Sequence, residues 1–143
     1  MKIKLLNKNA KIPTQGSTAA AGYDLYASKA CIIEPGQSVL VHTGLSMEIP
    51  SGYWGGIFAR SGLATKQGLR PANCVGVIDS DYRGEIMVAL YNDSTFEREI
   101  SVGDRIAQLV FLPVCTPLRG FEVVDELSNT ERGDGGFGST GKN

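Results

Sequence analysis

The residues best suited to chemistry lie in a glycine-rich run near the C-terminus, Arg-Gly-Asp-Gly-Gly-Phe-Gly-Ser-Thr-Gly at 132–141. Glycine lets successive backbone N–H groups converge on an anion, because no Cβ restricts φ or blocks close approach. Arg132 can hold phosphate oxygens in a bidentate fork, and Phe137 can stack on a flat base. Ser139 and Thr140, which follow Gly138, can donate further hydrogen bonds. The run predicts a lid that closes over a nucleotide, whereas composition alone favours a solvated glycine tail.

A second candidate phosphate site is the sequence Ala-Arg-Ser-Gly-Leu-Ala at 59–64. Residues 61–68 form the one stretch with helical character, with Ser61 as the expected N-cap and Gly68 as the expected end. A helix N-terminus presents unpaired N–H donors, and Arg60 adds formal charge beside Ser61 and Gly62. The alternative, a capped helix with a surface arginine, explains this stretch equally well.

A third stretch, residues 73–85, combines three side chains that suit a nucleoside and its hydrolysis. Asn73 carries both a donor and an acceptor, as reading a pyrimidine edge requires. Tyr82 offers a flat surface for a sugar. Asp79, expected at a half-buried strand end, can act as a general base. Apolar arms at 75–78 and from Ile86 onward predict a hairpin around the polar turn.

Asp24 lies between apolar and aromatic residues in the strand-like sequence Ala-Gly-Tyr-Asp-Leu-Tyr-Ala at 21–27. Aspartate is unfavourable in strands, so a local role is expected for this residue. It either holds a hydrated cation or makes an Asx-turn or strand-edge hydrogen bond.

Short alternating segments separated by turns predict an all-β domain, a jelly-roll-like barrel or sandwich with one short helix. Residues 37–49 alternate as expected for two half-buried strands around Thr43-Gly44. The nearly continuous apolar run 106–112, which Pro113 ends, predicts a strand buried on both faces. Apolar side chains thin out near Ser128, so we expect a β domain at 1–127 and a mobile arm at 128–143 that closes over an active site.

Composition narrows the classes of function. The 143 residues carry a net charge of −1, which argues against binding nucleic acid through its phosphates. Three scattered cysteines indicate reduced intracellular thiols, and the single histidine, His42, leaves histidine-dependent chemistry little support. With no apolar run of membrane-spanning length and no signal-peptide pattern at 1–8, we expect no membrane partner and a cytoplasmic location, with the nucleus or a virus-infected cell as alternatives.

Taken together, five stretches resemble the ordered motifs of the trimeric dUTP diphosphatases (dUTPases). They are AGYDLYA, ARSGLA, NCVGVIDSDYRGE, GDRIAQLVF and RGDGGFGSTG, and the resemblance runs from about residue 12 to residue 141. One departure is Ala59, where the family usually has a proline. This change affects loop stiffness more than chemistry.

The resemblance implies a homotrimer of jelly-roll-like subunits whose active sites are built from all three chains. It implies hydrolysis of dUTP to dUMP and pyrophosphate with Mg²⁺, which keeps uracil out of DNA and supplies dUMP for thymidylate synthesis. Asp79 activates water for attack at the α-phosphorus, and Tyr82 packs under the deoxyribose. Asp24 orients metal-bound water, while the metal itself is held mainly by the substrate phosphates.

The resemblance also implies the remaining substrate contacts. Asn73 and the backbone of Gly76, Val77 and Ile78 pair with the uracil edge. The phosphates are held by Arg60, Ser61, Gly62 and Gln108. The arm of another subunit closes the site with Arg132, Phe137, Gly138, Ser139 and Thr140. Two alternatives stay open: a non-catalytic nucleotide-binding regulatory protein on the same fold, and a dCTP deaminase-like enzyme.

Overall fold

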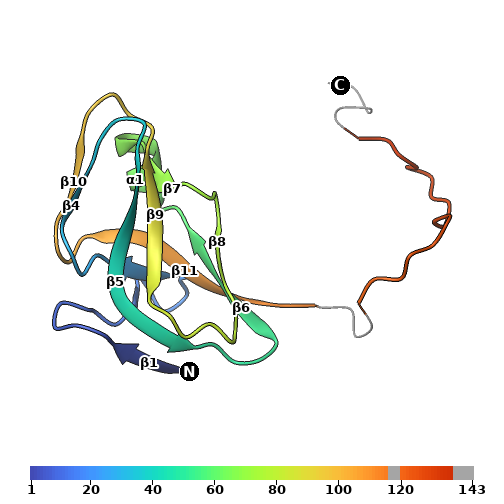
Figure 1. The fold of residues 1–143 in the computed structure, drawn as a ribbon, viewed down its shortest axis with the longest axis horizontal. Coiled ribbons are helices and arrows are strands. Elements are labelled where there is room, and N and C mark those ends of the chain that lie inside the picture. The colour runs from blue at the N-terminus through green and yellow to red at the C-terminus, as the bar shows by residue number, and fades with distance from the viewer. Residues whose placement is uncertain (116–119, 137–143) are drawn as a thin grey trace.

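The computed structural model describes residues 1–115 and 120–136, and it confirms the all-β, jelly-roll-like class (Figure 1). Three antiparallel sheets have the strand orders β1-β5-β9-β7, β2-β3-β11-β6-β8 and β10-β4. Their strands are β1 (Lys2–Leu5), β2 (Thr14–Gln15), β3 (Tyr23–Tyr26), β4 (Cys31–Ile33), β5 (Ser38–Glu48), β6 (Tyr53–Phe58), β7 (Leu69–Pro71), β8 (Gly76–Ile78), β9 (Ile86–Asn92), β10 (Arg98–Ile100) and β11 (Arg105–Pro113). Among the described residues, no helix has the length and apolar character needed to span a bilayer.

The core lies between the four-stranded and five-stranded sheets. Alternation along β9 places Ile86, Val88 and Leu90 inside, where they join Leu25 and Leu109 of the other sheet in one buried cluster. Because side chains alternate across a strand, the residues between them face the other way and are half-buried. β11 forms as the apolar run predicts, but it is fully buried only near its start, and its last residues are half-buried or exposed.

Within the segment 37–49, β5 (Ser38–Glu48) is one long strand, not the two strands expected around Thr43-Gly44. β5 continues through this point with a bulge, since its pairing with β9 shifts register between His42 and Leu45. Gly44 has φ of 70°, a conformation that glycine adopts without strain. The Thr43 hydroxyl donates to the Ile86 carbonyl, and the Gly44 N–H donates to the Glu85 carboxylate. These two hydrogen bonds satisfy polar groups at the bulge, and β5 continues to Leu45 without a reverse turn.

The prediction of a hairpin between residues 75–78 and the strand from Ile86 onward is also wrong. β8 pairs with β6 in the five-stranded sheet, whereas β9 pairs with β5 and β7 in the four-stranded sheet. Residues 79–85 therefore cross from one sheet to the other, and we call them the crossover segment. The polar turn residues were recognised correctly, but each apolar arm finds its partners in a different sheet.

The one helix of the described chain, α1 (Ser61–Gln67), begins one residue earlier than expected. Arg60, in extended conformation with φ −81° and ψ 126°, is the N-cap, so Ser61 is the first helical residue and not the cap. An ion pair to Asp24 holds the side chain of this N-cap residue beside β3. Gly68 ends the helix as predicted, in the left-handed region with φ of 69°.

Beyond Pro113 the described chain forms no further strand, and residues 120–136 run away from the barrel (Figure 1). Phe121 is 94% exposed, Val123 98% and Leu127 86%. Apolar side chains in such positions gain from burial against another surface.

Candidate active site

Asp24 is the centre of the first cluster of polar side chains. It lies on β3 and is 6% exposed, although it carries a carboxylate. Its Oδ1 lies 3.1 Å from Arg60 Nε, and its Oδ2 lies 3.3 Å from Arg105 Nη1. A buried carboxylate requires such partners, because desolvation without them is costly. The two guanidinium groups together outweigh its charge, so this end of the sheet is locally cationic.

Strand pairing brings Gln108 to the same place. Gln108 of β11 lies opposite Asp24 on one side and opposite Phe58 of β6 on the other. Two residues beyond Phe58, Arg60 is the N-cap of α1, whose first residues, Ser61 and Gly62, are exposed. No atom lies within 4 Å of the position that a Cβ on Gly62 would occupy. The structure thus gathers Asp24, Arg60 and Gln108 beside an open chain segment that a polyanion can approach.

The second cluster surrounds a hollow of about 250 Å³ that Val77, Ile78, Asp79 and Tyr82 line together with Leu40, Glu85 and Met87. Tyr82 is 42% exposed, and its hydroxyl donates to the Glu85 carbonyl at 3.1 Å. Asp79 directly follows β8 and is exposed, not half-buried as expected. The reason is the crossover: the chain leaves the sheet at Ile78, so Asp79 has no strand covering it.

β8 itself presents free backbone groups. It is the last strand of its sheet, so the edge that faces away from β6 has no strand partner in the described chain. Gly76 packs tightly, because a Cβ there would lie 3.1 Å from Ile57 Cβ and 3.6 Å from Asn73 Nδ2. Asn73 is therefore close to the start of this edge. A planar ring with donors and acceptors along one side can pair with such an edge as a strand would.

The two clusters do not meet in one chain. Ile78 pairs with Gly55 of β6, and Gln108 pairs with Phe58, three residues further along. At about 3.4 Å per residue, Gly55 and Phe58 are ~10 Å apart along β6. Asp79 lies beyond the Gly55 position and Arg60 lies beyond Phe58, so the two residues lie toward opposite ends of β6. Among the described residues, the hollow lined by Asp79 does not include Arg60, Ser61 or Gln108. The described chain thus carries two separate clusters.

The C-terminal candidates are only partly visible. Arg132 is exposed, and its Nε donates to the Gly135 carbonyl at 2.8 Å. The predicted contacts of Phe137, Gly138, Ser139 and Thr140 lie outside the described residues.

Sequence reasoning missed two residues. Arg105 shares Asp24 with Arg60, and the only available signal was its place in the GDRIAQLVF motif. No role for Glu85 follows from the sequence, although its carboxylate contacts both His42 and Gly44. Neither partnership follows from local pattern, because the partners are 81, 43 and 41 residues away in the chain.

An antiparallel jelly roll with a cationic cluster at one end of a sheet and a hollow of about 250 Å³ at the other favours the class of small all-β nucleotide-binding proteins. The chain belongs to the dUTPase family, whose family model matches residues 8–141.

Relatives and solved structures agree with that membership. The chain is 48% identical to the deoxyuridine 5'-triphosphate nucleotidohydrolase of Yarrowia lipolytica, covering 100% of this chain and 90% of the relative. It is 51% identical to the protein of the same name from Nautilia profundicola, covering 99% of each. The dUTPase of Staphylococcus bacteriophage 80alpha with dUPNHPP superimposes with a TM-score of 0.91 at 32% identity, covering 98% of this chain and 97% of the other. A mutant dUTPase of phage phi11, in a structure that details a structural Mg(II) ion, gives a TM-score of 0.80 at 26% identity, covering 87% and 96%.

Proposed function

We propose that this chain hydrolyses dUTP to dUMP and pyrophosphate. The observation that carries the proposal is the hollow in which Asp79 and Tyr82 lie beside the free edge of β8. Relatives that cover the whole chain bear the name deoxyuridine 5'-triphosphate nucleotidohydrolase, and a neighbour of the same fold binds the nucleotide dUPNHPP.

Uracil pairs with the free edge of β8 through the backbone of Gly76, Val77 and Ile78, with Asn73 adding a side-chain contact. This mode is strand addition with a base in place of a peptide. The ring of Tyr82 lies under the deoxyribose. A ribose 2′-hydroxyl would be excluded by contact with that ring, provided that the ring stays fixed.

Asp79 acts as the general base. An exposed carboxylate at the end of β8 is free to accept a proton from a water molecule that attacks the α-phosphorus. The pyrophosphate group then leaves with the negative charge that Arg60, Ser61, Gly62 and Gln108 stabilise. Phosphoryl transfer depends mainly on such positioning and charge stabilisation.

The side chains around Asp24 suit a Mg²⁺ ion that is bound mainly by the substrate phosphates. Among the described residues, no group of three or more His, Cys, Asp or Glu side chains is arranged to hold a metal. Both oxygens of Asp24 already contact arginines, which favours a contact with the ion through water. Mg²⁺ keeps several waters and is commonly bound by substrate phosphates, whose charge it neutralises.

The functional unit is a homotrimer with shared active sites. Two half-sites at opposite ends of β6 become complete sites when the Asp79 hollow of one subunit faces the Arg60 cluster of another. The exposed apolar side chains of 120–127 gain a surface to pack on. The arm 128–143 then reaches a site on a neighbouring subunit, where Arg132, Phe137, Gly138, Ser139 and Thr140 cover the nucleotide.

One assay tests the activity: pyrophosphate release by the purified protein from dUTP, dTTP, UTP and dCTP with Mg²⁺. We expect release from dUTP with strong preference over the other three. Tight dUTP binding without release would instead establish a regulatory nucleotide-binding protein, and ammonia release from dCTP would establish a deaminase.

A further inference from the structure

The crossover segment 79–85 carries Asp79 and Tyr82 but contains neither helix nor strand. Its shape must come from side-chain and turn contacts. At its start, the Tyr82 N–H donates to the Asp79 carbonyl at 3.2 Å. Arg83 Nη1 then donates to the carbonyls of Ser80 and Tyr82 at 2.8 and 2.9 Å. These bonds close the segment on itself and do not tie it to the barrel.

The side chain of Glu85 connects the crossover segment to β5 of the barrel. Its Oε1 accepts the Gly44 N–H at 2.8 Å, and its Oε2 lies 2.9 Å from His42 Nδ1. Both partners belong to the bulged part of β5. The carboxylate thus fixes the end of the crossover segment to the one irregular place in the four-stranded sheet.

The same residue reaches the sugar platform. The backbone carbonyl of Glu85 accepts the Tyr82 hydroxyl at 3.1 Å, which holds the ring over Gly84. A Cβ at position 84 would overlap the Tyr82 ring, so the glycine permits this close packing. One chain of contacts from the β5 bulge to the Tyr82 ring therefore passes through Glu85, while Thr43 of the same bulge bonds the carbonyl of the next residue, Ile86.

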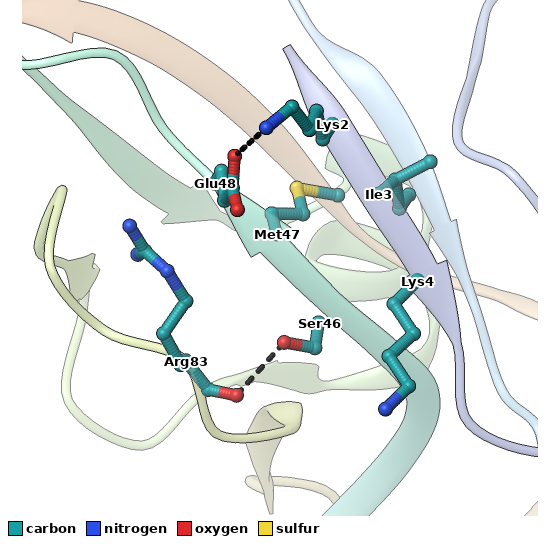
Figure 2. Close-up of a pocket in the computed structure, with 7 residues that line it drawn as sticks. All are labelled: Lys2, Ile3, Lys4, Ser46, Met47, Glu48 and Arg83. Atoms are coloured by element: carbon teal, nitrogen blue, oxygen red, sulfur yellow. Dashed lines mark hydrogen bonds and ion pairs between the residues drawn. The ribbon is translucent and has the colours of Figure 1, made fainter.

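A second bond holds the other side of the segment. The Ser46 hydroxyl donates to the Arg83 carbonyl at 2.8 Å, at the hollow that Figure 2 shows between β1, β5 and Arg83. That hollow has a volume of about 410 Å³ and is lined by Lys2, Lys4 and Glu48, with an ion pair of 3.0 Å between Lys2 and Glu48. None of the residues that line it lines the hollow at Asp79, so the two hollows are distinct.

We propose that Glu85 is a positioning residue: paired with His42 and Gly44, it fixes the Tyr82 ring and so sets the discrimination between deoxyribose and ribose. The proposal rests on the proposed function, because it takes Tyr82 as the sugar platform. Glu85 lines the same hollow, and in this role it acts on the sugar through the Tyr82 ring that its carbonyl holds.

The ionisation of Glu85 agrees with this role. Partial burial acts to raise the pKa of Glu85, but the hydrogen bonds from His42 and from the Gly44 N–H outweigh it, and the pKa is lowered. The carboxylate is therefore charged at neutral pH and bonded through both oxygens. Its side chain is 23% exposed, which limits competition from water.

The test compares Glu85→Ala with Glu85→Gln and, as a matched control, Glu48→Ala, which removes a different ion-paired carboxylate from the four-stranded sheet. Steady-state kinetics with dUTP and UTP are measured for each. For Glu85→Ala we expect KM for dUTP to rise about 10-fold with a smaller change in kcat, because a loosened platform weakens substrate and transition state alike. The preference for dUTP over UTP should fall about 5-fold or more.

Glu85→Gln should restore both values to within about 2-fold, because its amide oxygen accepts the Gly44 N–H and its amide nitrogen donates to His42. Glu48→Ala should match the wild type. Unchanged KM and unchanged sugar preference in folded Glu85→Ala would overturn the proposal. If Glu85→Ala does not fold, His42→Ala, which keeps the Gly44 contact, decides by the same sugar preference. Asp79→Asn in the same assay reports separately on the proposed function, because full turnover there contradicts the mechanism whatever Glu85 does.

Discussion

Two aspartates with different surroundings divide the chemistry at the residue scale. Asp24 is buried, and its two oxygens form ion pairs with Arg60 and Arg105, so its carboxylate holds these two guanidinium groups in place. Asp79 is exposed at the end of β8 and free to face a ligand. The general base is therefore expected at Asp79, and the electrostatic anchor at Asp24.

Replacing Asp79 by Asn tests this division. We expect turnover of dUTP to fall by about 10²–10⁴, the usual contribution of a general base, with little change in nucleotide affinity. Pyrophosphate release and binding of a non-hydrolysable dUTP analogue measure the two quantities. Turnover like that of the wild type would remove Asp79 from the mechanism.

Glu85 gives a prediction on acid stability. Its pKa is lowered in the folded state, so the unfolded chain binds the proton more readily. The stabilisation from ionised Glu85 is complete above the unfolded pKa, about 4.3, and is lost as pH falls through the lower folded pKa. Denaturant unfolding from pH 3 to 7 should show wild type and Glu85→Gln converging toward pH 3. A difference that stays constant over this range would contradict the assignment.

At the scale of elements, the edge strand β8 and the bulge in β5 shape the hollow that Asp79 lines. β8 stays unpaired on its outer edge, and the bulge in β5 presents the Gly44 N–H to Glu85. The crossover segment connects the two. Each of these features departs from regular sheet structure, and each adjoins the hollow lined by Asp79.

We expect the arm 128–143 to be the other functional element, and its removal is the third prediction. Deleting residues 128–143 should leave a folded trimer with an almost unchanged melting temperature, because the buried core ends at Leu109. Turnover should be severely reduced, since the predicted lid is lost. Calorimetry and pyrophosphate release measure the two, with removal of 142–143 alone as the control. A truncated chain that cannot fold would mean that the arm is structural.

At the scale of the whole molecule, the separation of the two half-sites predicts complementation between subunits. Asp79→Asn and Arg60→Ala should each have severely reduced turnover as homotrimers. After joint unfolding and refolding in equal amounts, about one quarter of the sites combine an intact Asp79 with an intact Arg60 from different subunits. Pyrophosphate release should recover to about that fraction. Absence of recovery in trimers shown to be mixed would mean that each site is complete within one chain.

The sequence by itself determined the features that depend on neighbouring residues. The all-β class, the strand at 106–112 and the helix end at Gly68 follow from alternation and from glycine in the left-handed region. The ordered motifs were enough to predict the family, which the family model confirms.

Only the tertiary structure decided which distant groups are partners. The hairpin at 75–91 and the turn at Thr43-Gly44 were wrong because an apolar strand accepts any edge that buries it. Local pattern does not rank those edges. The pairs Arg105–Asp24 and His42–Glu85 join residues 81 and 43 positions apart. They form because burying a carboxylate requires a bonded partner, and the packing of the whole chain selects that partner.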